Sequence, residues 1–557
     1  MRRWRTALIS AVALAALLVP VQSAVADGPG EPRQRDAKPG PSYQLGHGKK
    51  KTQARASALA DHTITLRGVD INGQPVAPLA SLIDLGTGTE YILSQSGGTL
   101  TGTVPDGDYS LTAIVLTGNP YAPDDLALYG DPTLTVGGDV DLTMDARTAT
   151  EISSVSPSAT ATEYQSHAQL VQTIAGQVIT TTVSGTPTTG LRAWPSASTT
   201  RPYYFTYSEC KTEPLTTLPS PRVYKLAFPT TGQIPTNLTF TAPESSLALV
   251  NTTYASQGVA SDGVGPHATI VDYDGIGGSV VGLTNPASAP STQRVYYTAN
   301  GVKWRSDYFY VVGGYQVAER DTGPRTFTAG TTTSETWHKA AFGPTMPVGH
   351  GQGTLIARPL LADTGTLGHE NFSGNYSDGT TGTLTLYRNG TLVGQSTNPL
   401  AGDWTVPAAA ANYRLDLAVQ RTVPWSLYAK KINTSWTFPS AERPGDPFAD
   451  QRDLLQPRIT GAFDSSGRAP SGTTFPLDVV AQRAADGSAV TSVSLKASFN
   501  DGVTWTTVPL TANGTDRWTA NVTHPSVNNG YVALRFTASD SSGFAVQQTV
   551  TRAYGLN

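Results

Sequence analysis

Cysteine is almost absent from this sequence, and charged residues are scarce. The 557-residue chain contains one cysteine, Cys210, and Asp, Glu, Lys and Arg together make up 14% of it. A single cysteine excludes a disulfide within the chain, so hydrophobic cores must stabilise the fold in place of the bridges common in small exported domains. Cys210 can be a reactive thiol, a link to another molecule or a buried inert side chain beside Tyr207, and we favour burial.

Long apolar segments are also rare. The one candidate, at about 7–19, follows three arginines within the first five residues and precedes the small-residue triplet 24–26. This order is typical of a secretory signal peptide, which we expect to be cut after Ala26. Because the apolar stretch is shorter than the roughly 18–20 residues that span a bilayer, we expect a secreted, extracellular protein with no membrane span.

Positive charge is not in excess. Lys and Arg number 38 and Asp and Glu number 42, which gives a formal net charge of −4. Loss of residues 1–26, which contain three Arg and no acid, leaves −7. A mildly acidic surface repels phosphate backbones, and the cluster Lys49–Lys51 is too short to reverse this. We therefore expect no nucleic-acid partner.

Turn-forming and β-branched residues are abundant instead. The 55 Gly and 39 Pro residues are accompanied by frequent Thr and Ser, a composition that favours strands and tight turns. A chain of this length predicts several domains, because single cores stop growing at a few hundred residues. We therefore predict an all-β fold made of several β-sandwich domains in tandem.

Changes of pattern along the chain divide it into seven segments. Residues 27–61 have few large apolar groups to offset the entropy of ordering, so we expect a disordered leader there. The expected segments are a signal peptide (1–26), the leader (27–61), a first sandwich (62–148), a β-rich middle region (149–360), a second sandwich (361–440), a linker (441–453) and an immunoglobulin- or fibronectin-like sandwich (454–557). Within the middle region, residues 163–172 are a candidate short helix.

Two short motifs predict local structure. Pro105 and Gly107 form a bend, after which Tyr109 begins an alternating strand. Asn389 and Gly390 separate two alternating segments, and this dipeptide favours a two-residue hairpin turn because both residues accept positive φ. We assign structural roles to these residues.

A third motif lies near the C-terminus. The run 498–505 resembles the Asp box of sialidases, S-x-D-x-G-x-T-W, with Asn500 in place of the aspartate. That motif marks a hairpin away from the sialidase active site, so a single copy implies a folded hairpin shaped by Ser498, Gly502 and Trp505. We expect the side chains of Trp505 and Trp436 in the core.

The run V-P-x-G-x-Y-x-L at 104–111 resembles the signature of transthyretin-like domains, also called carboxypeptidase regulatory-like domains, which are small accessory sandwiches. A set of motifs taken in order resembles the non-catalytic C-terminal region of large secreted bacterial subtilisin-like serine proteases. The motifs are V-P-x-G-x-Y (104–109), D-A-R (145–147), Y-R-L (413–415), W-T-F (436–438), S-F-N-D-G-V-T-W (498–505) and T-V-T-R-A-Y (549–554). Those proteases carry a catalytic domain ahead of this region, whereas after the expected signal peptide only a leader of about 35 residues precedes the first sandwich here. The resemblance therefore implies accessory domains and transfers no catalytic residue.

Several strings are similar to active-site motifs. Asp321 and Asp363 each begin an Asp-Thr-Gly triplet, and His369 follows the second one. The two aspartates could share a proton only if their carboxylates lay about 3 Å apart. Asp-Thr-Gly is also a common turn sequence, and we favour turns at both positions. His350 lacks the second histidine of the subtilisin motif, and we find no nucleophile elbow from which to build a serine triad. We therefore predict no catalytic residue.

Metal-binding patterns are equally weak. The histidines are scattered and H-E-x-x-H is absent from the sequence, which argues against zinc. The run Asp272–Gly275 begins like a calcium loop but lacks the third acidic ligand and the distal glutamate. We favour a solvated turn there, with calcium between the loops of a sandwich as the alternative. We expect no metal site and no cofactor.

These observations favour a secreted, non-catalytic binding or accessory protein. Its partner would be an extracellular polymer, a cell envelope or a secreted protein. The 23 Tyr and 9 Trp residues can stack on sugars or anchor interfaces, although we expect most of them in cores. One alternative is a hydrolase with its site at residues 150–360, which a deep cleft holding His350 or His369 beside a carboxylate and a hydroxyl would favour. Another is an inactive or truncated relative of a subtilisin-like protease.

Overall fold

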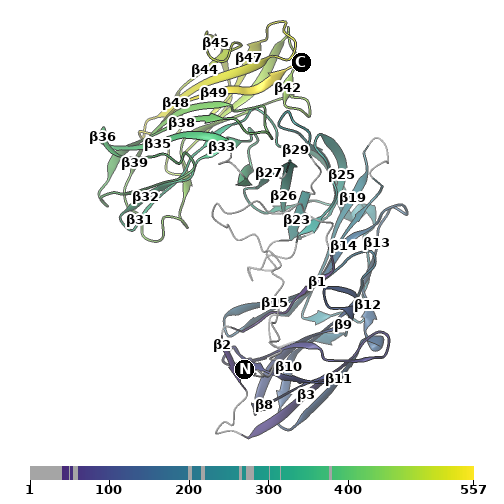
Figure 1. The fold of residues 1–557 in the computed structure, drawn as a ribbon. Helices are drawn as coiled ribbons and strands as arrows, with labels where there is room; N and C mark the ends of the chain where they lie inside the picture. The colour runs from purple at the N-terminus through teal and green to yellow at the C-terminus, as the bar shows by residue number, and fades with distance from the viewer. Residues whose placement is uncertain are drawn as a thin grey trace, which may run out of the picture.

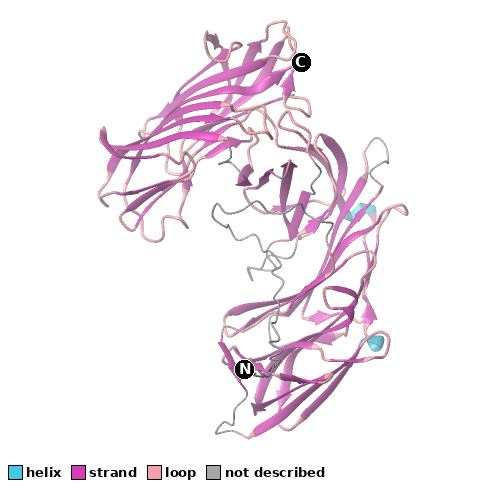
Figure 2. Ribbon diagram, viewed as in Figure 1, coloured by secondary structure: helices cyan, strands magenta, loops and turns pink. Residues whose placement is uncertain are grey.

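The structure is a computed structural model, and it confirms the all-β fold class (Figure 2). It describes residues 40–48, 50–53, 60–198, 203–214, 220–261, 266–270, 282–299, 301–313, 315–374 and 379–557. Within these ranges the helical elements are two short 3₁₀ helices, η1 (Ala146–Thr148) and η2 (Glu244–Ser246). No helix of the described part is long and apolar enough to cross a membrane. The expected signal peptide and the run Asp272–Gly275 lie outside the described residues.

The N-terminal unit contains two sheets packed face to face. Their shared core includes Leu66 from one sheet and Leu111 from the other, both fully buried. The seven-stranded sheet has the order β12 (Thr150–Glu151), β16 (Gly190–Ala193), β10 (Ala122–Val136), β9 (Gly107–Asn119), β5 (Leu79–Asp84), β6 (Thr89–Ile92) and β2 (Lys50–Gln53). The five-stranded sheet has the order β11 (Val140–Asp145), β3 (Asp61–Val69), β8 (Thr99–Pro105) and β7 (Ser94–Ser96), with β4 (Pro75–Val76) beside β3.

The expected disordered leader contributes strands. Within that range, β1 (Ser42–Gln44) pairs antiparallel with β15 (Gln177–Gly185), and β2 pairs parallel with β6. An added strand gains its order from main-chain hydrogen bonds to a sheet edge, which a composition poor in apolar side chains does not prevent. The prediction of disorder is therefore wrong for these two segments.

A third sheet packs on the other face of the seven-stranded sheet. Ile114 of β9 and Leu170 of the third sheet belong to one core, so β9 is covered on both faces. The eight-stranded sheet has the order β1, β15, β14 (Thr162–Ile174), β18 (Tyr203–Thr212), β19 (Arg222–Thr231), β25 (Ser291–Thr298), β22 (Leu247–Tyr254) and β29 (Thr332–Trp337). Two small pairs flank it: β13 (Ser153–Val155) with β21 (Thr239–Thr241), and β17 (Ser196–Ala197) with β20 (Gln233–Ile234).

The candidate helix at 163–172 is instead part of strand β14. This strand pairs with β15 on one side and β18 on the other. Most of its side chains are buried on both faces, so the alternation that identifies a half-exposed strand is missing. The prediction of a helix is wrong for this reason.

A six-stranded sheet follows in the middle of the chain. Its order is β24 (Leu283–Thr284), β23 (Pro266–Ile270), β26 (Lys303–Val312), β27 (Tyr315–Asp321) and β34 (His369–Gly374), with β28 (Arg325–Thr326) beside β26. Trp304 of β26 shares a core with Val295 of the eight-stranded sheet, and Val317 of β27 contacts Trp425 of the C-terminal unit. This sheet therefore joins the two halves of the molecule.

The C-terminal unit is built around a nine-stranded sheet (Figure 1). Its order is β36 (Thr391–Ser396), β35 (Thr380–Arg388), β38 (Ala411–Arg421), β39 (Lys431–Ser440), β49 (Ala545–Leu556), β48 (Tyr531–Asp540), β44 (Val490–Ser498) and β45 (Thr506–Val508), with β42 (Arg468–Ala469) beside β49. One face is covered by β41 (Gln456–Gly461), β43 (Thr474–Gln482), β47 (Arg517–Thr523) and β46 (Leu510–Gly514), and by β37 (Gly402–Thr405), β32 (Thr354–Ala357), β31 (Pro347–Gly351) and β40 (Arg452–Asp453). A small pair, β30 (Gly343–Thr345) with β33 (Leu360–Asp363), completes the unit.

The ranges 361–440 and 454–557, which we expected to form separate sandwiches, share this sheet. Strand β39 from the first range pairs along its length with β49 from the second. Leu415 and Val550 belong to a single core that extends across both ranges. The expected linker 441–453 therefore connects two parts of one sandwich.

Candidate functional site

A cluster of buried charged side chains lies where β27 pairs with β34. We call Glu319, Asp321, His338 and His369 the Glu319 cluster. The Nδ1 atom of His369 lies 3.0 Å from Oε1 of Glu319, and its Nε2 atom lies 3.5 Å from Oδ1 of Asp321. The ring of Trp337 stacks on the imidazole of His369 with centroids 4.2 Å apart. The site therefore holds His369 in one orientation.

Burial and pairing act in opposite directions on the central pair. Burial raises the pKa of Glu319, but the hydrogen bond from His369 and the nearby imidazoles outweigh it and leave this pKa below its usual value. Burial lowers the pKa of His369, but its bond to Glu319 and the charge of Asp321 outweigh burial and leave this pKa raised. The two shifts favour an imidazolium–carboxylate pair.

His338 is held differently from His369. Its backbone N–H donates a hydrogen bond to Glu319, and its ring lies edge-on to Tyr308 and Tyr310, with centroids 5.1 Å away in each case. Neither ring nitrogen has a hydrogen-bond partner in the described part of the chain. Burial lowers the pKa of His338 to about 4, so this ring is neutral at neutral pH.

The aspartates of the two Asp-Thr-Gly triplets have separate partners. Asp321 accepts a hydrogen bond from the backbone N–H of Ser306 and pairs with Arg325 at 3.0 Å. Asp363 pairs with Arg458 at 2.8 Å. A proton-sharing dyad requires the two carboxylates to face one another, whereas here each one faces an arginine. The triplets are therefore held in structural ion pairs.

His350 lies on β31 beside a hydroxyl. Its Nδ1 atom is 2.9 Å from Oγ of Ser440, and its Nε2 atom is buried without a partner in the described part of the chain. The Glu442 carboxylate accepts a hydrogen bond from the backbone of Gly353 at 2.8 Å. In a serine triad the hydroxyl bonds to Nε2 and the carboxylate to Nδ1. The arrangement around His350 therefore differs from that of a triad.

The hollow beside His350 is small. It has a volume of about 30 Å³ and is also lined by Arg443 and Asp453. Burial raises the pKa of Asp453 to about 6. A second hollow of about 20 Å³ is lined by Asp363. Spaces of this size hold a water molecule or two, and neither is lined by His369.

The bend and hairpin residues stabilise local structure. The hydroxyl of Tyr109 donates to the carbonyl oxygen of Pro105 at 2.7 Å, close to Gly107. Asn389 and Gly390 connect β35 to β36 with φ angles of 48° and 81°. These positive values are the ones that a type I′ hairpin turn requires.

The Asp-box residues form a hydrogen-bonded loop after β44. The hydroxyl of Ser498 accepts from the backbone N–H of Gly502 at 2.9 Å, and Asn500 accepts from that of Thr504 at 2.9 Å. The indole N–H of Trp505 donates to the carbonyl oxygen of Gly502 at 2.9 Å. Loop closure therefore fixes the position of the indole ring.

The two tryptophans predicted in the core differ. Trp436 is fully buried, as expected. Trp505 is half-buried, and the guanidinium of Arg535 lies 4.2 Å from its ring centroid. The core prediction is wrong for Trp505 because the loop folds the ring against the solvent-facing side of the sheet.

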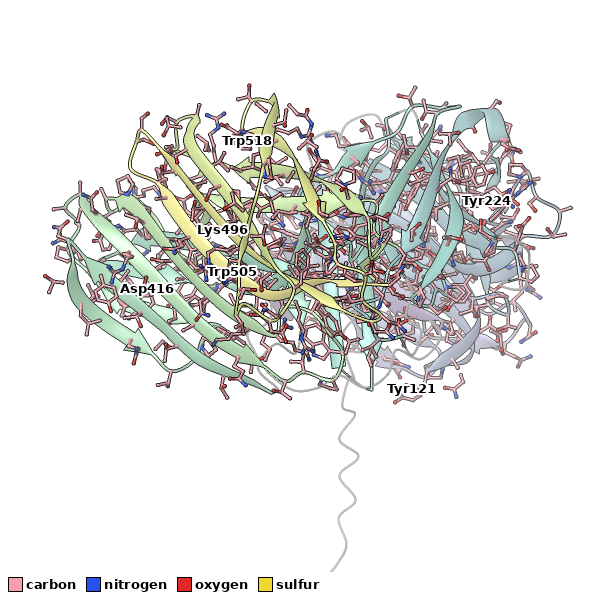
Figure 3. The ribbon with its side chains drawn as sticks, turned by 90° about the horizontal axis from the view of Figure 1, so that it is seen from above. Tyr121, Tyr224, Asp416, Lys496, Trp505 and Trp518 are labelled. Carbon is pink, nitrogen blue, oxygen red and sulfur yellow. The ribbon has the colours of Figure 1, made fainter. Side chains whose placement is uncertain are left out.

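That solvent-facing side, opposite the core, is a broad polar surface that we call the outer face. Figure 3 looks onto it and marks Asp416, Lys496 and Trp505. Along each strand, outward polar side chains alternate with buried apolar ones. The outward hydroxyl and amide side chains include Thr383, Asn433, Ser435, Thr437, Gln547, Thr549, Thr537 and Ser494.

One row of the outer face crosses four strands. Asn433, Thr549, Arg535 and Lys496 are successive cross-strand partners on β39, β49, β48 and β44. With strands about 4.8 Å apart, the row spans roughly 14 Å. The ring of Trp505 lies against Arg535, the third member of the row, so hydrogen-bonding groups, cations and an aromatic ring adjoin one another.

The fold and this surface define the class of protein as all-β, with several packed β-sandwiches and an open sheet face at the C-terminal end. A scan against models of known protein families finds no match, and a search of curated proteins finds no similar sequence.

Sequence reasoning did not find Arg535 or Lys496. Both lie in segments in which apolar and polar residues alternate. The direction of their side chains, away from the core, could therefore have been inferred from the apolar residues on either side. That they are cross-strand partners on β44 and β48 depends on the order of strands in the sheet, which the local sequence does not show. No sequence motif marks the contact of Glu319 with His369, which depends on the pairing of β27 with β34.

Proposed function

We propose that the chain is an exported, non-catalytic binding protein and that the outer face binds an extended polysaccharide. The single observation that carries this proposal is the position of the Arg535 guanidinium over the half-buried ring of Trp505, 4.2 Å from the ring centroid, within a polar row. Export is supported by the signal-like residues 1–26. The order of motifs supports an accessory role beside secreted proteases.

The chemistry of the outer face suits a sugar chain. Hydroxyl and amide side chains such as Ser435, Thr549 and Gln547 can both donate and accept hydrogen bonds, as sugar hydroxyls do. Trp505 adds a half-buried aromatic ring that holds the Arg535 guanidinium beside these groups. A long flat face also matches an extended ligand better than a small molecule, which binds in concave sites.

The test is binding of the chain lacking residues 1–26 to polysaccharides, measured by sedimentation with insoluble polymers and by calorimetry with soluble ones. We expect Trp505→Ala to weaken binding about tenfold, since it removes the ring that holds the Arg535 guanidinium in place. The control is Trp518→Phe, because Trp518 is also half-buried but lies on β47 in the opposite sheet, where its ring packs against the core and the phenylalanine ring keeps that space filled. Binding that both variants retain, or no binding to any polysaccharide, would reject the proposal.

A hydrolase is the second candidate, favoured by the hydrogen bond of 2.9 Å between His350 and Ser440. A fluorophosphonate probe distinguishes it from the binding protein. Labelling that disappears in Ser440→Ala would establish a reactive serine. We expect no labelling. His350 bonds to the Ser440 hydroxyl through Nδ1, and in the described part of the chain no carboxylate bonds to its Nε2 atom to orient it as a base.

A further inference from the structure

The charges of the outer face are not balanced within the protein. Lys431, Lys496 and Arg535 point outward and have no ion pair in the described part of the chain. The remaining outward pair, Arg414 and Asp416, is neutral as a unit, with 3.2 Å between its charged atoms. The face is therefore cationic on a chain whose formal net charge is −4.

Two of these cations oppose each other directly. Lys496 and Arg535 are cross-strand partners on β44 and β48. Like charges in this position destabilise a sheet. The nearest acidic group of the Asp-box loop, Asp501, is bound by Arg552 at 3.0 Å. The unfavourable pair is therefore left without an internal counter-ion.

The guanidinium of Arg535 is nevertheless fixed in place. Its Nε atom donates to Oγ1 of Thr549 at 3.2 Å, and its plane packs on Trp505. Its two terminal nitrogen atoms have no hydrogen-bond acceptor in the described residues. Terminal guanidinium nitrogens presented in this way match the two oxygens of a carboxylate.

We infer that the polysaccharide bound by the outer face is anionic and carries carboxylate groups, which the Lys496–Arg535 pair recognises beside Trp505. This inference rests on the proposed function. The ligand supplies the counter-charge that the sheet lacks, and the surrounding hydroxyl and amide side chains bind the sugar hydroxyls.

The distribution of charge argues for such a glycan over a nucleic acid. A nucleic-acid strand carries a charge on every phosphate and is bound along a continuous cationic track. Here the cations are few, and Asp416 lies on the same face. A carboxylated glycan offers neutral hydroxyl groups as well as charge, which matches the composition of the row.

The test compares polygalacturonate with its fully methyl-esterified form, which keeps the sugar chain and removes the charge. Lys496→Met and Arg535→Gln are each expected to weaken binding of polygalacturonate about tenfold, the loss typical of a charge-assisted hydrogen bond. Raising the salt concentration is expected to weaken it as well. The matched control is Arg517→Gln, since Arg517 is an exposed arginine on β47 in the opposite sheet.

A thermal readout is independent of the binding assay. Lys496→Met relieves the repulsion with Arg535, so we expect the variant to melt at a higher temperature than the parent without ligand and to gain less from polygalacturonate. Equal binding of the esterified polymer would overturn the inference while leaving the proposed function intact. Binding of neither polymer, nor of any neutral polysaccharide, would reject both. Tighter binding of single-stranded oligothymidylate would also overturn the inference.

Discussion

The Nδ1 atom of His369 lies 3.0 Å from Oε1 of Glu319, and both side chains are almost entirely buried. The raised pKa of the histidine and the lowered pKa of the glutamate indicate that the pair is charged. Asp321 and the stacked ring of Trp337 complete the surroundings of the imidazole. The sheet that joins the two halves of the chain therefore depends on both partners, since removing one would leave the other charge buried without compensation.

Glu319→Gln is predicted to lower the free energy of unfolding by about 3 kcal/mol, because removing one partner of a buried ion pair leaves the other without compensation. Urea denaturation followed by fluorescence measures the change. Glu370→Gln is the control, since Glu370 forms a partly exposed pair with Arg320 at 2.9 Å, and such pairs contribute at most about 1 kcal/mol. Equal effects of the two changes would contradict the assignment.

The contributions of His338 and His167 to the free energy of unfolding are predicted to fall as the pH falls from about 6.5 to about 4. Burial lowers the pKa of His338 to about 4 and that of His167 to about 3, whereas unfolded histidines take up a proton near 6.5. Between these values the two histidines bind more protons in the unfolded chain than in the folded chain, so their protonation favours unfolding, with a slope of up to about 1.4 kcal/mol per pH unit for each histidine. Burial raises the pKa of Asp453 to about 6, which acts in the opposite direction, so the histidine contribution is measured by comparing a variant with the parent.

His338→Leu tests this assignment. Removing one titrating group should change the slope of the free energy of unfolding against pH by the equivalent of about one proton, toward less destabilisation by acid. The backbone hydrogen bond from residue 338 to Glu319 is kept. Denaturation midpoints at pH 7, 6, 5 and 4 provide the measurement. A slope that does not change would show that His338 is protonated similarly in both states.

Lys225→Met is predicted to stabilise the protein at pH 7. Burial lowers the pKa of Lys225 to about 8, below the usual 10.5, so the unfolded chain binds more protons between these values and stability rises with pH across them. At pH 7 the penalty is fully present and amounts to about 3 kcal/mol. Loss of the hydrogen bond from Nζ to the Leu283 carbonyl and of the interaction with Cys210 costs about 2 kcal/mol, which leaves a net gain of about 1 kcal/mol. A variant that is less stable than the parent at pH 7 would contradict the prediction. So would a variant whose stability still rises with pH as that of the parent does.

Local patterns predicted several elements correctly. Residues 383–388 and 391–393 alternate around Asn389-Gly390, and the structure places β35 and β36 there, joined by the positive φ angles that this dipeptide favours. Burial of Cys210 was also expected and is observed. Each of these features is determined by residues close together in the sequence.

Features that depend on distant pairing could not be predicted. Strand β14 is covered on both faces, so its residues do not alternate and resemble a helix as much as a strand. The contact of Trp505 with Arg535 requires β44 and β48 to be neighbours, and strand order is not encoded locally. The same limit applies to Glu319 and His369, which meet across β27 and β34.

The shared sheet of the C-terminal unit leads to the last prediction. A fragment of residues 454–557 is expected not to fold alone, because β49 would lose its pairing with β39, and Val546 and Val550 would lose contacts with the rest of their core. A fragment of residues 340–557 keeps both halves of that core and is expected to unfold cooperatively. Circular dichroism during thermal unfolding, with dispersion of amide signals in NMR spectra, distinguishes the two. Cooperative unfolding of the shorter fragment would contradict this prediction and support two separate sandwiches. A fragment of residues 454–557 that folds alone cannot depend on β39, which it lacks.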